Sequence, residues 1–184
     1  DLYYLHNYDP TTPVEEILRG LDDLVRAGKL RYIGASNFLA WQLARANLLA
    51  EFHGWSPFVV IQAHYHLLER GLEKELLPFC ASQGVGLVPY FPLAGGFLTG
   101  KYKAGEAAPA GSRGESSGYV QQYMTPANYT FVERLDAWAR ERGRGGITRT
   151  VPLMRLPLGP LRKLRFRAWR GARSCNLAVW RRDL

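Results

Sequence analysis

Apolar segments typical of buried strands return along the chain at a nearly constant spacing, and a helical pattern lies between each pair. They begin near residues 2, 31, 58 and 86, so the repeat is 27 to 29 residues long. Two parallel strands need a crossover of about this length, and the crossover is usually a helix. The repeat therefore predicts an α/β fold with about four βα units and a parallel sheet.

The individual elements follow from the same pattern. We expect strands at residues 2–5, 30–35, 58–62 and 85–90. Apolar residues at three- and four-residue steps predict helices between them, ending at Gly28, Gly54 and Gly84, and a further helix over 129–142. Ser36 or Asn37 is the expected N-cap of the second helix.

A closed barrel accounts for this repeat better than an open sheet does. No G-x-G-x-x-G turn follows any of the predicted strands, which disfavours a doubly wound dinucleotide-binding sheet. Eight units of about 28 residues make roughly 224 residues, near the ~250 typical of the eightfold barrel. We therefore interpret residues 1–142 as an incomplete (β/α)8 TIM barrel.

A polar or aromatic side chain stands at the end of each predicted strand. These residues are His6, Ser36 with Asn37, Gln62 and Tyr90. One such residue alone is how an ordinary turn begins. Four consecutive strands ending in this way favour a shared site, because chemistry in barrels sits at the carboxyl ends of the strands.

With their neighbours, these residues resemble the aldo/keto reductases. The motifs are Leu-His at 5–6, Gly-x-Ser-Asn-Phe at 34–38, Gln62 and Tyr-x-Pro-Leu-Ala-Gly-Gly-Phe-Leu-Thr-Gly-Lys-Tyr at 90–102, in that order. The resemblance covers residues 1–142 and implies a barrel enzyme that reduces aldehydes or ketones by hydride transfer. It implies NADP as cofactor, with NAD as the alternative. In this register the chain is a fragment that carries the family's fourth to seventh βα units.

The resemblance also implies roles for the residues at the strand ends. His6 corresponds to the active-site histidine that hydrogen-bonds the substrate carbonyl. Ser36, Asn37 and Gln62 correspond to residues that bind the nicotinamide carboxamide, a group that needs both donors and acceptors. Tyr90 corresponds to the aromatic residue on which the nicotinamide ring stacks.

The glycine-rich segment after the fourth strand resembles the family's loop over the cofactor pyrophosphate. Pro92, Leu93 and Gly95 belong to it, and Lys101 would supply a positive charge to a phosphate. Phe91 stands where the family has a serine, so one hydroxyl contact to phosphate is absent.

The family's proton donor is a tyrosine assisted by a lysine and an aspartate, and no tyrosine of this chain matches it. A general acid contributes about 10²- to 10⁴-fold to the rate of such reactions. We therefore expect residues 1–184 alone to show no measurable carbonyl reductase activity.

Residues 143–184 break the pattern of the preceding chain. They hold 11 Lys and Arg against a single acid, a net charge of +10, whereas residues 1–142 have a net charge of −2. Neither an eighth strand nor its helix is recognisable in this irregular, arginine-rich tail. We interpret the tail as aberrant and favour out-of-frame translation of GC-rich coding sequence, which is rich in Arg, Pro, Gly and Trp codons.

Two other functions remain open at this point: a non-catalytic nucleotide-binding barrel module, or a basic nucleic-acid-binding protein that acts through the tail. The expected partner is a small carbonyl compound, without specific nucleic acid or membrane. The first residues resemble no secretory leader, and no apolar run reaches the length of a membrane span, so the cytoplasm is the expected location.

Two further patterns allow more than one interpretation. His64 and His66 alternate after Gln62, but no third ligand has suitable spacing, so we expect no metal. Residues 103–125 are long for a connection and are expected to be a disordered segment or a lid.

Overall fold

The structure, a computed structural model, describes residues 1–143, 164–168 and 178–182. The described chain forms two compact units. The first, which we call the sheet unit, contains residues 1–65 and 70–90 together with the two short strands of the tail. The second, the loop unit, contains residues 66–69 and 91–143.

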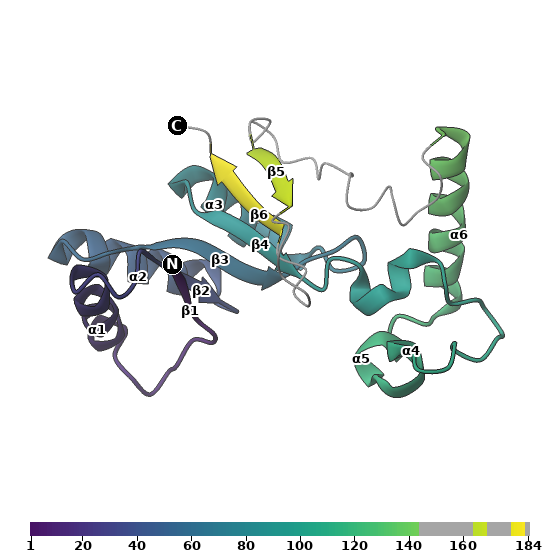
Figure 1. The fold of residues 1–184 in the computed structure, drawn as a ribbon, viewed down its shortest axis with the longest axis horizontal. Coiled ribbons are helices and arrows are strands. Elements are labelled where there is room, and N and C mark those ends of the chain that lie inside the picture. Colours follow the sequence, from purple (N-terminus) through teal and green to yellow (C-terminus); the bar gives the residue numbers. More distant parts are fainter. Residues whose placement is uncertain (144–163, 169–177, 183–184) are drawn as a thin grey trace. The chain divides into compact units, whose positions relative to one another are not determined.

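Four parallel strands form the sheet of the first unit, in the order β1-β2-β3-β4 (Figure 1). They are β1 (Leu2–Leu5), β2 (Tyr32–Ser36), β3 (Phe58–His64) and β4 (Gly86–Tyr90). Neighbours in the sheet are neighbours along the chain, so the predicted βα array is confirmed. β3 continues past Gln62 to His64, and Gln62 is therefore inside the strand rather than at its end.

Helices connect successive strands, as predicted. They are α1 (Val14–Arg26), α2 (Ala40–His53) and, after the short 3₁₀ helix η1 (Gly71–Lys74), α3 (Leu76–Gln83). Gly54 and Gly84 adopt the left-handed conformation that ends α2 and α3, at φ 65° and 68°.

The predicted N-cap of α2 is wrong. Leu39 occupies that position, and its backbone N–H donates to Gln42 Oε1 over 2.8 Å. Ser36 is instead the last residue of β2, and Asn37 turns the chain with a φ of 57°. Both residues are thereby kept at the end of the strand, away from the first turn of the helix.

One row of residues across the sheet shows why a glycine is needed in β2. Gly34 pairs in register with Tyr4 of β1 and with Val60 of β3. A Cβ on Gly34 would lie 2.7 Å from Tyr4 Cε1 and 2.8 Å from Val60 Cγ1, so its absence leaves the space that these two larger side chains occupy. Because side chains alternate along a strand, Ser36 and Gln62 lie on this same face, one step toward the carboxyl end.

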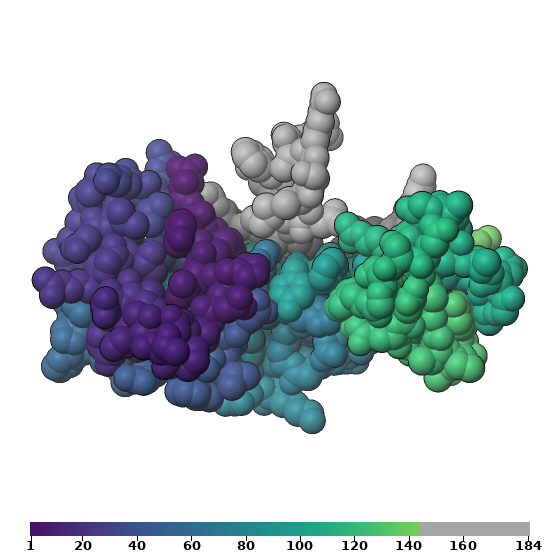
Figure 2. Space-filling model, turned by 90° about the horizontal axis from the view of Figure 1, so that it is seen from below, coloured from purple at the N-terminus to yellow at the C-terminus, as the bar shows by residue number. Residues whose placement is uncertain are grey.

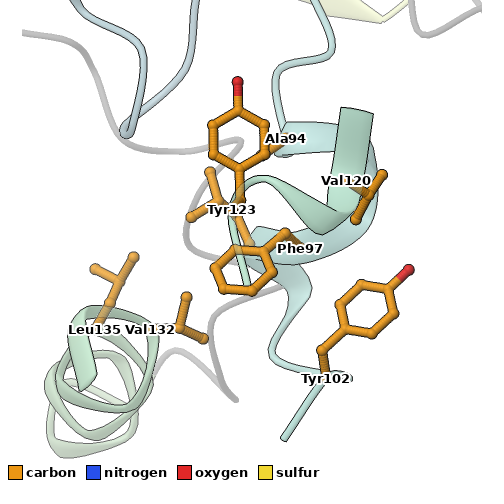
Figure 3. Packing of buried hydrophobic residues seen from close by; sticks show 8 residues of the cluster. Ala94, Phe97, Tyr102, Val120, Tyr123, Val132 and Leu135 are labelled. Carbon is orange, nitrogen blue, oxygen red and sulfur yellow. The ribbon is translucent and has the colours of Figure 1, made fainter. Parts of the chain in front are cut away.

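The loop unit folds around an aromatic and aliphatic core. It contains the 3₁₀ segment η2 (Ala94–Thr99), two one-turn helices, α4 (Arg113–Ser116) and α5 (Gly118–Gln121), and the long helix α6 (Pro126–Glu141). Figure 3 shows the Phe97 ring in the middle of this cluster, with Val132 and Leu135 of α6 to one side and Tyr102 to the other.

The expectation of disorder for residues 103–125 is wrong. Val120 is 1% exposed and Tyr123 is also buried, so the segment contributes to the core of the loop unit. Backbone hydrogen bonds such as Ser117 N to the Arg113 carbonyl (2.8 Å) close its short turns.

The described part of the arginine-rich tail contains two strands that the sequence did not predict. β5 (Leu164–Ala168) and β6 (Ala178–Arg182) pair antiparallel as a separate two-stranded sheet. The rest of the tail beyond residue 143 lies outside the described residues.

The surface of the sheet unit includes its first strand. The space-filling view shows the N-terminal segment, coloured purple, at the surface (Figure 2), and Tyr3 of β1 is 49% exposed. Among the residues that the structure describes, no helix is long and apolar enough to cross a membrane.

Candidate active site

One residue, Asn37 at the end of β2, is hydrogen-bonded to all three other strands or the turns that follow them: its side chain contacts the turn after β1 and Tyr90 of β4, and its backbone contacts β3. Asn37 Nδ2 donates to the His6 carbonyl (3.1 Å) and to Asn7 Oδ1 (3.0 Å), just after β1. The Tyr90 hydroxyl at the end of β4 donates to Asn37 Oδ1 (3.0 Å), and Asn37 N donates to the Gln62 carbonyl of β3 (3.1 Å). We call these five residues the Asn37 network.

Asparagine suits this position for two physical reasons. Its φ of 57° lies in the left-handed region, which asparagine tolerates better than most residues with a Cβ. Its side chain offers two N–H donors and one oxygen with two lone pairs. Both donors and one lone pair are used within the network, so Asn37 Oδ1 can still accept one further hydrogen bond.

Tyr90 is held by its ring as well as by its hydroxyl. His64 is its register partner across β3 and β4, and the two rings stack at a centroid distance of 5.1 Å with an interplanar angle of 4°. The hydroxyl contact to Asn37 and the imidazole contact together fix the orientation of the phenol ring.

His6 follows β1 directly and is exposed. The loop after it is preformed by Asp9, whose Oδ1 accepts from Thr11 N (2.8 Å) and Thr11 Oγ1 (2.6 Å) and whose Oδ2 accepts from Thr12 Oγ1 (2.6 Å). These hydrogen bonds to the ionised carboxylate lower the pKa of Asp9 to about 2. The imidazole of His6 therefore stands at the start of an ordered turn.

The remaining predicted site residues lie in the loop unit. Pro92 and Leu93 are half-buried and lead into η2, inside which Gly95 and Gly96 have φ values of 65° and 106°. The Lys101 ammonium lies 3.5 Å from the point where a Cβ on Gly96 would stand. The lysine head group therefore lies beside the backbone of Gly96, at van der Waals distance from where a Cβ would be.

Phe91, which replaces the serine expected from the resemblance, also has a left-handed φ, 51°. Its ring packs on Tyr119 at 4.6 Å, and the Arg113 guanidinium carbon lies 6.0 Å from its centroid. The side chain at position 91 thus has aromatic and cationic neighbours in the loop unit, but no hydroxyl to offer.

The model of the aldo/keto reductase family matches residues 1–150 of the chain. The chain belongs to this family. The match extends past residue 142, where we placed the end of the barrel segment.

Individual relatives agree with this assignment. An aldo-keto reductase of Fusarium vanettenii is 45% identical over 98 residues, which are 53% of this chain and 26% of the relative. Versiconal hemiacetal acetate reductase of Aspergillus parasiticus is 32% identical over 143 residues, 78% of this chain and 42% of the relative. The chain thus spans less than half the length of these relatives.

A solved structure confirms the fold class. The glycerol dehydrogenase AKR11B4 from Gluconobacter oxydans superimposes with a TM-score of 0.71 at 28% sequence identity. The superposition covers 87% of this chain and 47% of that enzyme, which fits an incomplete barrel of the aldo/keto reductase type.

We call the carboxyl-end edge of the four-stranded sheet the rim; it contains residues 6–7, 36–37, 62–64 and 90. These residues fit the nicotinamide cofactor that the family implies. Ser36 is fully buried, and its Oγ finds no hydrogen-bond partner among the described residues. Gln62 is its register partner on β3 and is half-buried. A buried hydroxyl without a partner costs about 1–3 kcal/mol, and a bound carboxamide would satisfy it.

Sequence reasoning found four of the five residues of the Asn37 network but missed two features of the rim. Asn7 was not predicted as a partner of Asn37, because the sequence pattern brings the strand ends together but does not show which side chains there hydrogen-bond. His64 was considered only as a metal ligand, although its spacing of two from Gln62 places it on the same face of β3.

Proposed function

We propose that the protein is an NAD(P)H-dependent oxidoreductase that reduces aldehydes or ketones, and that the rim of the sheet unit receives the nicotinamide half of the cofactor. The bound cofactor supplies the hydride. The observation that carries the proposal is the Asn37 network, which draws the predicted residues of four separate strands to one edge of the sheet.

His6 is the residue that meets the substrate. Its main chain is anchored by Asn37, and its exposed imidazole can donate a hydrogen bond to a carbonyl oxygen. That oxygen gains negative charge during reduction, so a donor aimed at it stabilises the transition state more than the ground state.

Ser36, Gln62 and Asn37 orient the carboxamide. Ser36 Oγ and the Gln62 amide can each donate or accept, whereas Asn37 can only accept, because both of its N–H groups are used by His6 and Asn7. The nitrogen of the carboxamide is therefore expected on the side of Asn37. Tyr90 supplies the flat surface for the ring.

The glycine-rich segment of the loop unit is proposed to bind phosphate. Gly95 adopts a left-handed conformation and has no side chain, so an anion can approach its backbone, whereas the Gly96 N–H already donates to the Leu93 carbonyl (2.9 Å). The exposed Lys101 adds a point charge. We propose NADP as the cofactor, with NAD as the alternative.

Binding of NADPH to the purified chain tests the proposal. We expect Ser36→Ala and Gln62→Ala each to raise the Kd for NADPH by about 3- to 10-fold, the equivalent of one lost hydrogen bond. Ser82→Ala is the matched control, because Ser82 Oγ is hydrogen-bonded within α3, where it donates to the Phe79 carbonyl (2.9 Å) and accepts from Gln83 Nε2 (3.3 Å). Equal affinities of the two rim variants and the wild type would contradict the proposed site.

We further propose that residues 1–184 alone bind cofactor without turning over a carbonyl substrate, because no tyrosine of the chain matches the family's proton donor. The measurement is NADPH consumption with a panel of aldehydes and ketones. Turnover that follows the protein peak in chromatography and disappears in His6→Ala would show that this part of the proposal is wrong.

A further inference from the structure

The imidazole of His64 has no role in the site proposed above, yet it lies against a residue that does. His64 ends β3, two positions after Gln62, and it pairs in register with Tyr90 at the end of β4. The two rings are almost parallel, with an interplanar angle of 4° and centroids 5.1 Å apart. Cross-strand neighbours on one face of a sheet meet in this way.

The contact determines which face of Tyr90 another ring can use. A phenol ring has two faces, and His64 covers one of them. A nicotinamide that stacks on Tyr90 therefore cannot use the face that His64 covers. The hydroxyl of Tyr90 is held by Asn37 Oδ1 over 3.0 Å, and a hydrogen bond at the end of the ring's long axis does not by itself fix the rotation of the ring about that axis.

We propose that His64 is a positioning residue, which fixes the plane of the Tyr90 ring and thereby the plane in which the nicotinamide stacks. This inference rests on the proposed function. It assigns to His64 no contact with substrate or cofactor.

His64 can orient the Tyr90 ring because its imidazole is itself a planar aromatic ring. Stacked aromatic pairs contribute about 0.5–1.5 kcal/mol beyond the area they bury, whereas an aliphatic side chain of similar size gives no preferred plane. A phenylalanine at position 64 should therefore preserve the orientation of Tyr90, and a leucine or an alanine should not.

The first measurement uses two ligands. We expect His64→Ala and His64→Leu to raise the Kd for NADPH by about 2- to 10-fold, the factor that corresponds to loss of one stacked pair. Their Kd for adenosine 2′,5′-bisphosphate, which has no nicotinamide ring, should stay at the wild-type value. His64→Phe should restore the NADPH affinity.

A matched control separates this effect from the general loss of a stacked histidine. His53 stacks on Trp55 at a centroid distance of 4.3 Å and an angle of 18°, at the end of α2 and before the first residue of β3, Phe58, whereas His64 is the last residue of that strand. His53→Ala should leave both affinities unchanged. Equal NADPH affinities of the Leu and Phe variants would overturn the inference, because bulk alone would then suffice.

The second measurement needs no cofactor. Tyrosine ring carbons labelled with ¹³C report the environment of Tyr90, and Tyr90→Phe identifies its signal. We expect this signal to shift in His64→Ala and His64→Leu and to return toward its wild-type position in His64→Phe. An unshifted signal in both aliphatic variants would overturn the inference. Failure of the wild-type chain to bind NADPH would instead contradict the proposed function, while the tyrosine signals still decide the role of His64.

Discussion

The Asn37 network and the core of the loop unit are stabilised in opposite ways. The network consists of polar contacts among mostly exposed residues, and His6, Asn7 and Asn37 are all open to solvent. The loop unit instead packs Phe97 and Val120, each 1% exposed, against neighbouring aromatic rings. One region is held by directed hydrogen bonds and the other by close packing.

The difference teaches where stability and function lie in this chain. A typical intramolecular hydrogen bond contributes only about 0.5–1.5 kcal/mol net, and solvent competes for exposed ones. In a close-packed core, even one added carbon atom destabilises the fold, typically by about 1–3 kcal/mol. The rim should therefore tolerate substitution without unfolding, so that rim variants can test the proposed binding of the cofactor, whereas substitutions in the core of the loop unit should destabilise the fold.

The largest expected effect is that of Gly95→Ala. A Cβ at this position would lie 2.6 Å from Val120 Cγ2, and the φ of 65° disfavours any residue with a Cβ. Overpacking costs about 1–3 kcal/mol and the left-handed conformation about 1–2 kcal/mol more. We expect a loss of about 2–5 kcal/mol in the free energy of unfolding, measured by urea denaturation followed by circular dichroism.

Two other glycines of the loop unit divide this effect into its parts. Gly105 has a similar φ of 76° but nothing within 4 Å of a Cβ, so Gly105→Ala should show the conformational cost alone. Gly118 has neither a positive φ nor a close neighbour, so Gly118→Ala should be neutral or slightly stabilising. If Gly95→Ala costs no more than Gly105→Ala, the packing argument is wrong.

The second prediction tests why substitutions at the rim should cost little stability: because the contacts there are polar, or because they are exposed to solvent. Asp22 of α1 is a polar anchor that is only 4% exposed, and it accepts hydrogen bonds from Ser56 N (2.8 Å), Ser56 Oγ (2.9 Å) and Arg26. Hydrogen bonds to charged groups contribute about 1.5–3 kcal/mol. We expect Asp22→Asn to lower the free energy of unfolding by about 2 kcal/mol at neutral pH.

This effect should depend on pH in a defined direction. Burial alone would raise the pKa of Asp22, but the hydrogen bonds from Ser56 and the contact with Arg26 hold it below its ordinary value of 3.8. A lowered pKa stabilises the fold fully above pH 3.8, and the contribution is lost as the pH falls through the pKa of the folded state. The difference between wild type and Asp22→Asn should therefore shrink in acid. The exposed Asp23→Asn is the control, and a constant difference down to strong acid would contradict the assignment.

The sequence predicted the sheet unit more fully than the loop unit, and the reason lies in how far apart contacting residues are. Buried parallel strands such as β2 are continuous apolar runs, and the helices between them show a regular stripe, so both can be recognised locally. Phe97, Val120 and Leu135 belong to no common period. They meet only because the chain folds back on itself, so residues 103–125 resembled a disordered loop.

Polar contacts were the other limit. Asp22 follows Leu21 on the buried side of α1, where a carboxylate appears as an interruption of the apolar stripe until its partner Ser56 is seen. The positions at the rim could be predicted, because a parallel sheet brings its carboxyl ends to one edge. Which of them hydrogen-bond depends on side-chain rotamers, and these have no signature in the sequence.

The smallest expected change in stability, and the sharpest test of the comparison, is that of Asn37→Gly. Glycine keeps the left-handed backbone at φ 57° without strain, so the substitution removes only the side chain at the centre of the network. Because the lost hydrogen bonds are exposed, the free energy of unfolding should fall by only about 1 kcal/mol. The Kd for NADPH should rise by about 10-fold or more, since Tyr90 and the turn at His6 lose their common hydrogen-bond partner.

The Asn37→Asp variant is the intermediate case, because an aspartate can still accept from Tyr90 but cannot donate to the His6 carbonyl. Its Kd for NADPH should lie between those of Asn37→Gly and the wild type. A large loss of stability of Asn37→Gly with an unchanged Kd for NADPH would contradict the contrast drawn between the two regions. The hydrogen bonds of the rim would then stabilise the fold and would not organise the binding site.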